Sequence, residues 1–166
     1  MTRERLLLVT RIVLIALVAA TLAFIFGNSI LPPDESKEQS DTVKDIILEI
    51  LPDGSPAESF VEQYIRKIAH FSEYGLLGIE VALYMIILER RRLRFAPLSL
   101  IFALVVSFTD ESIQMFTERG PAIMDVWIDV GGFAFFSLIT YAVFALSLLA
   151  ALAVRALRAR QNTELE

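Results

Sequence analysis

Ionisable and hydrogen-bonding side chains gather at one end of three apolar stretches, and their types suit acid–base chemistry or ligand binding. Ten residues form this set: Lys67, His70, Glu73 and Tyr74 at the start of the second stretch, Asp110, Glu111, Gln114 and Arg119 at the end of the third, and Asp125 and Asp129 at the start of the fourth. Charges at membrane depth are costly, so they usually face a bundle interior or a watery cavity and mark function. The pattern therefore predicts a buried polar site near one membrane surface.

Four of these residues are candidates for catalysis. His70, activated or oriented by Glu73 one turn away, suits a general base or a nucleophile. Asp110 and Glu111 suit proton donors to a leaving group, and they point about 100° apart on a helix, so they face different neighbours.

The other six residues are candidates for ligand binding: Lys67, Tyr74, Gln114, Arg119, Asp125 and Asp129. Arg119 offers a planar fork that matches phosphate or carboxylate. So many neighbouring acids require protonated carboxyl groups or a divalent cation, for which oxygen ligands favour Mg²⁺, Ca²⁺ or Mn²⁺. Asp110, Glu111, Asp125 and Asp129 could hold such a cation, and the sequence does not choose among them.

A purely structural account of the same residues is the alternative. Lys67 would extend to the membrane surface, Asp125 would cap a helix, and the remaining charges would form ion pairs. Burying several ion pairs costs more than an apolar bundle would, which favours a functional site. Glu80 stands apart near mid-membrane, and we expect it to be protonated or bonded to Ser107, Ser137 or Thr140.

Four apolar stretches, at about residues 6–26, 68–88, 95–116 and 126–154, are long enough to cross a bilayer as helices. The fold class that follows is all-α, an integral membrane bundle of four transmembrane helices. We expect one domain over residues 1–160 and a disordered tail at 161–166.

Arginines mark one side of this bundle. They precede the first span, join the second to the third and follow the fourth: Arg3, Arg5, Arg90, Arg91, Arg92, Arg94, Arg155, Arg158 and Arg160. The positive-inside rule makes that side cytoplasmic, with both termini inside the cell and the polar site at the outer leaflet.

The predicted outer loop, residues 28–62, carries nine acidic residues against two lysines. Residues 42–51 place their apolar side chains on one helical face, which predicts an amphipathic helix that lies on the membrane or caps the bundle. Ser55, Pro56 and Glu58 form a capping-box pattern, so the helix of the second span is expected to begin as early as Pro56.

Composition excludes several other classes. The chain has 166 residues, of which 55% are hydrophobic, and it has no cysteine, so disulfides and thiolate chemistry are excluded. A single histidine excludes multi-histidine metal clusters. No basic tract with interleaved aromatics indicates nucleic-acid binding.

These motifs resemble those of the VanZ-like family of small bacterial membrane proteins. The matching residues are Lys67, His70-Phe71 and Glu73-Tyr74, then Asp110-Glu111, Gln114, Phe116 and Arg119, then Asp125 and Gly132, with Ser29, Ser36 and Ser40 after the first span. The chain departs from the family pattern at Asp129, where asparagine is expected, and at Glu80, where an apolar residue is expected.

The resemblance implies a cell-envelope role and an association with resistance to glycopeptides, notably teicoplanin, without an established reaction. Two functions follow as expectations. The protein acts on a lipid-linked envelope precursor or a glycopeptide at the outer leaflet, or it is a non-enzymatic modulator or scaffold whose charged network is structural. In both cases its partners are membrane lipids, and no nucleic acid is expected.

Overall fold

The computed structural model describes residues 2–52, 55–89, 94, 96–117 and 122–164. Five helices follow one another: α1 (Arg3–Ile30), α2 (Pro33–Leu48), α3 (Pro56–Leu88), α4 (Ser99–Phe116) and α5 (Ile123–Glu164). Four stretches are long and apolar enough to cross a membrane: Arg3–Ile30, Gln63–Leu88, Ala96–Phe116 and Ile123–Arg158. The prediction of an all-helical protein with four candidate spans is therefore confirmed, with α1, α3 and α5 longer than the predicted spans and α4 shorter.

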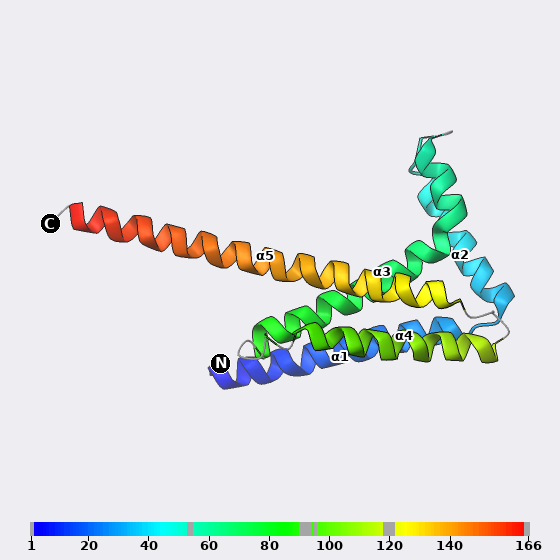
Figure 1. The fold of residues 1–166 in the computed structure, drawn as a ribbon, viewed down its shortest axis with the longest axis horizontal. Coiled ribbons are helices and arrows are strands. Elements are labelled where there is room, and N and C mark those ends of the chain that lie inside the picture. The colour runs from blue at the N-terminus through cyan, green and yellow to red at the C-terminus, as the bar shows by residue number, and fades with distance from the viewer. Residues whose placement is uncertain (1, 53–54, 90–93, 95, 118–121, 165–166) are drawn as a thin grey trace.

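The four long helices form a ring in which α1 packs on α3 and α4, while α5 packs on the same two helices from the other side. The start of α1, the end of α3, the start of α4 and the end of α5 all lie toward the same end of the molecule (Figure 1). Helix α2 and the first part of α3 project together from the opposite end (Figure 1). An even number of crossings thus returns both termini to one side.

Two helix starts follow local sequence rules. The Ser55 side chain accepts a hydrogen bond from the backbone N–H of Glu58 at 3.2 Å, and Pro56 occupies the first turn of α3, as predicted. Helix α2 begins at Pro33, nine residues before the predicted helix. Its first half is polar and lacks apolar periodicity, but proline and two acids in the first turn favour a helix start.

No residue of helix α2 is buried, and the helix contacts mainly α3. On its surface, Lys44 Nζ donates to Asp41 Oδ1 at 2.7 Å, and this hydrogen bond lowers the pKa of the Asp41 carboxyl. Val43, Ile46 and Ile50 are exposed apolar side chains on this helix and its end. That combination is typical of a helix at a membrane surface.

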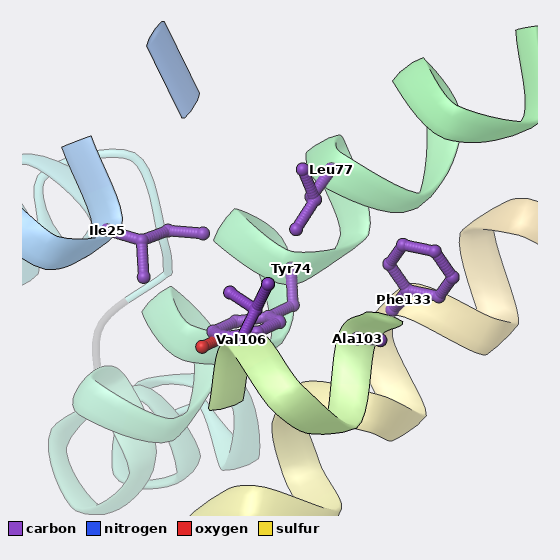
Figure 2. Packing of buried hydrophobic residues seen from close by; sticks show 6 residues of the cluster. All are labelled: Ile25, Tyr74, Leu77, Ala103, Val106 and Phe133. Atoms are coloured by element: carbon purple, nitrogen blue, oxygen red, sulfur yellow. The ribbon is translucent and has the colours of Figure 1, made fainter. Parts of the chain in front are cut away.

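The apolar core lies where the four long helices meet. Figure 2 shows its six side chains, one from α1, two from α3, two from α4 and one from α5: Ile25, Tyr74, Leu77, Ala103, Val106 and Phe133. Close approach of α3 and α5 sustains it, because a side chain at Gly132 would collide with the backbone carbonyl of Phe71.

Helix α5 extends far beyond the other helices (Figure 1). Most side chains of its second half are exposed, including Leu146, Leu149 and Leu152. The helix ends at Glu164, inside the segment 161–166 for which we expected disorder, and it follows a run of alanine, leucine and arginine at 156–160 that favours helix.

Candidate functional site

The centre of the site is a hydrogen-bonded chain from α3 through α5 to α4. His70 Nδ1 lies 3.2 Å from Asp129 Oδ1, and Ser107 Oγ donates to Asp129 Oδ2 at 2.6 Å. Asp129 is completely buried, and His70 is 9% exposed. The carboxylate that orients His70 is therefore Asp129 of α5, whereas the sequence interpretation assigned that role to Glu73.

Asp110 of α4 completes a trio of side chains that could ligate a metal ion. Its Oδ2 lies 4.0 Å from His70 Nδ1, and its Oδ1 accepts a hydrogen bond from Ser29 of α1. The available atoms of His70, Asp110 and Asp129 all lie within 4.8 Å of one another, and all three residues are buried. All four long helices thus contribute to one polar centre.

Glu111 faces another part of the bundle. Its Oε2 accepts a hydrogen bond from the backbone N–H of Ala122 at 2.9 Å, so it binds the segment that leads into α5. Its Oε1 is buried without a hydrogen-bond partner among the described residues. Asp125 lies in the first turn of α5, half-buried, where a negative charge suits the helix dipole.

Gln114 connects the trio to a cation that we did not predict. Its Oε1 accepts from Arg66 Nη2 at 2.9 Å, and its Nε2 lies 3.5 Å from Asp110 Oδ2. The neighbouring Lys67 is exposed, and its ammonium lies 5.6 Å from the centroid of the Tyr64 ring. Of the two adjacent cations on α3, Arg66 therefore faces the site and Lys67 faces outward.

A cavity of about 400 Å³ opens beside the trio, between α1, α2 and α3. Its polar lining includes Arg66, His70 and Glu73 from α3, and hydroxyl and amide groups of Asn28, Ser29, Ser36, Gln39, Ser40 and Thr42 from α1 and α2. Phe24, Val43, Ile65 and Ala69 form the apolar part. Helix α2 thus covers the site with polar side chains.

Glu73 lines this cavity, and its Oε1 accepts a hydrogen bond from Asn28 Nδ2 at 3.2 Å. Tyr74, on the next position of α3, is completely buried in the core, and its hydroxyl oxygen has no hydrogen-bond partner among the described residues. Ser107, which donates to Asp129, is close enough to interact with that hydroxyl, so the hydroxyl lies at the border between the core and the trio.

Glu80 is bonded to a residue outside the three that we expected. Thr21 of α1 donates to Glu80 Oε1 at 2.9 Å. Ser137 instead donates to the backbone carbonyl of Gly78, and Ser107 to Asp129. The prediction missed this partner because it considered only hydroxyls on α4 and α5, whereas α1 packs directly on α3.

Of the ten predicted site residues, the structure joins His70, Asp110 and Asp129 directly and Gln114 at their edge, while Arg119 lies outside the described residues. Sequence reasoning missed Asn28, Arg66 and Ser107 as members. A polar Asn28-Ser29 pair at the end of an apolar helix was the available signal for α1. Nothing in the sequence separates Arg66 from Lys67 without knowledge of the helix rotation.

The VanZ/LLP1 family model matches residues 12–149, which include the four candidate spans in whole or in large part and every predicted site residue. No curated protein and no solved structure matches the chain. Because the matched segment covers well over half of the sequence, this chain belongs to the VanZ/LLP1 family, as its motifs indicated.

Proposed function

We propose that this membrane protein binds the head group of a lipid-linked envelope molecule in the cavity between α1, α2 and α3. The observation that carries the proposal is the mixed lining of that cavity, in which one guanidinium, one carboxylate, one imidazole and several neutral polar groups stand beside an apolar wall. Lipid-linked sugar phosphates combine these same requirements, because they carry an anion, hydroxyl or amide groups and a hydrocarbon chain.

Arg66 is the residue that we assign to the anion. Its Nη2 donates to Gln114, which fixes the guanidinium and leaves other donors of its fork for a ligand. Glu73 and the hydroxyls of Ser36 and Ser40 would bind sugar hydroxyl or amide groups. A ligand with only an anionic group would meet repulsion from Glu73, so a larger polar head group suits the lining better.

The size of the cavity limits the ligand. Pockets for small molecules commonly measure about 300–1,000 Å³, so about 400 Å³ accommodates a head group or part of an acyl chain. A complete glycopeptide is much larger. Any effect on glycopeptide susceptibility would therefore arise from binding of an acyl chain or from competition for a lipid-linked precursor.

The outer leaflet is the proposed location of the cavity, with both termini in the cytoplasm. The support is the arginine distribution: the start of α1 carries Arg3 and Arg5, the second half of α5 carries Arg155 and Arg158, and the start of α1 and the end of α5 lie toward the end of the molecule opposite α2 (Figure 1). Cysteine labelling in intact cells should modify Ser40→Cys from outside and Arg92→Cys only after lysis. The reverse pattern would place the cavity at the inner leaflet.

The test of binding uses the two adjacent cations as a matched pair. Purified protein in detergent should bind a short-chain polyprenyl phosphate and bind the corresponding neutral polyprenol weakly. Arg66→Ala should weaken binding of the phosphate by about tenfold or more, because a hydrogen bond to a charged group contributes about 1.5–3 kcal/mol. Lys67→Ala should leave it within about twofold. Equal binding of phosphate and alcohol, or equal effects of both variants, would contradict the proposal.

Turnover of the bound molecule is a second candidate function, favoured by the contact between His70 and Asp129. An aspartate on Nδ1 orients the ring, and Nε2 of this cavity-lining histidine has no partner among the described residues. His70 would then transfer a proton to or from the ligand. Release of phosphate or of a free head group by purified protein, lost in His70→Gln, would establish catalysis; binding without turnover would identify a modulator.

A further inference from the structure

The trio, of which His70 lines the cavity, has the spacing of a metal site. Ligand atoms on one zinc ion lie about 2.0–2.2 Å from it, so two of them are separated by roughly 3–4.4 Å. His70 Nδ1 lies 3.2 Å from Asp129 Oδ1 and 4.0 Å from Asp110 Oδ2. Both separations fall within that interval, with one donor atom from each of α3, α4 and α5.

The outer oxygens of the two carboxylates are already bound by hydroxyls. Ser107 donates to Asp129 Oδ2, and Ser29 donates to Asp110 Oδ1. The other oxygen of each carboxylate is the one that faces His70, although Gln114 Nε2 makes a long contact of 3.5 Å with Asp110 Oδ2. Hydroxyls that hold the far oxygen orient carboxylates in metal sites, where partners behind the ligands tune the ion.

Tyr74 places a further polar atom beside the trio. Its side chain is completely buried, and its hydroxyl makes no hydrogen bond of normal length among the described residues, although Ser107 lies close enough to interact with it. A buried hydroxyl without a full hydrogen bond is costly, and an ion with a bound water or ligand oxygen beside it would provide a better acceptor.

We infer that His70, Asp110 and Asp129 bind one divalent transition-metal ion, Zn²⁺ in preference to Mg²⁺ or Ca²⁺. The sequence alone led us to expect an all-oxygen site for the hard cations. An imidazole among the ligands changes that preference, because nitrogen donors favour zinc. The double charge of the ion balances the two aspartates, which lowers the cost of placing them at membrane depth.

The ion would also determine what His70 does. A metal on Nδ1 leaves the ring proton on Nε2, so His70 could donate a hydrogen bond to an anionic head group and could not act as a base. This inference concerns occupancy of the trio and does not rest on the binding proposal, which is tested at Arg66.

The experiment measures metal content and thermal unfolding of the full chain, purified in detergent with and without EDTA. We expect about one zinc per chain by elemental analysis, and a midpoint that falls after EDTA and returns with Zn²⁺ but not with Mg²⁺. Asp129→Asn and His70→Gln should each reduce the bound zinc at least tenfold. Asp129→His keeps a ligand at that position and should retain zinc, which covers the case in which Asp129→Asn does not fold.

Glu80→Gln is the matched control, since Glu80 is a buried carboxylate on α3 outside the trio. It should retain about one zinc per chain. Cobalt substitution supplies a second signature, because visible absorption bands of bound Co²⁺ should be lost in the trio variants and kept in Glu80→Gln. Protein that holds no zinc and is unaffected by EDTA, or zinc that persists equally in Asp129→Asn and His70→Gln, would overturn the inference and leave a direct histidine–aspartate ion pair.

Discussion

Helix α3 carries two buried polar sites that differ in nearly every respect except burial. At His70, groups from α1, α3, α4 and α5 converge, and a cavity adjoins them. At Glu80, ten residues further along, the bonded partner is Thr21, while the second carboxylate oxygen has no partner among the described residues. The core side chains of Tyr74 and Leu77 separate the two sites. Convergence and access, more than burial, distinguish a functional site from a solitary polar residue in a bundle.

The largest expected effect is at Asp129. Replacing it by alanine removes the partner of both His70 and Ser107. Breaking such a buried pair typically costs about 3–5 kcal/mol, so Asp129→Ala should strongly lower the free energy of unfolding, measured in detergent by circular dichroism. A loss below about 1 kcal/mol would show that the convergent site contributes no more to stability than an ordinary surface group.

The next largest effect is expected at the close contact between α3 and α5 beside His70. A side chain at Gly132 would collide with the Phe71 carbonyl, whereas one at Gly131 would meet nothing within 4 Å. Overpacking typically costs about 1–3 kcal/mol, so Gly132→Leu should lower the thermal midpoint and weaken ligand binding together. Gly131→Leu serves as the control and should change neither. Equal behaviour of the two variants would contradict the close approach of the helices.

A smaller effect is expected at Glu80, where Glu80→Gln keeps an oxygen that accepts from Thr21 and removes an acid from mid-membrane. Stability should change by less than about 1 kcal/mol, or increase. Ligand binding should be unchanged. A loss of binding comparable to that of Asp129→Ala would show that Glu80 contributes to ligand binding as the site at His70 does.

Lys67→Ala should have the smallest effect. The side chain is exposed, and surface substitutions usually change stability by less than about 0.5 kcal/mol. Chemical denaturation in parallel with Asp129→Ala measures the contrast. A large loss would indicate that Lys67 contacts the site in a conformation other than the one described.

The helices were predictable because the bilayer requires long apolar segments, and the start of α3 was predictable because Ser55 and Pro56 act locally. Partnerships within the bundle depend on the rotation of each helix about its axis, which apolar composition constrains weakly. The sequence therefore suggested Glu73 as the partner of His70, whereas the contact of His70 Nδ1 is with Asp129, and both His70 and Glu73 line the cavity.

The sequence also could not decide which of several chemically similar side chains faces the site. Ser107 was a candidate partner for Glu80, yet it donates to Asp129. Arg66 and Lys67 are adjacent cations, and a rotation of about 100° decides which one faces the cavity. The shared depth of the polar residues predicted a polar site at this end of the bundle. Which of these residues contact one another could be read only from the packed helices.

The order in which the helices are made follows from the arrangement of the trio. Ser29 and His70 emerge from the ribosome first, then Asp110, and Asp129 last. Until α5 arrives, His70 and Ser107 lack the carboxylate that binds them in the finished protein. While only the earlier helices are inserted, His70 and Ser107 therefore lack the hydrogen-bond partner that α5 supplies. A chain interrupted before α5 should be recognised as incomplete and degraded by membrane proteases.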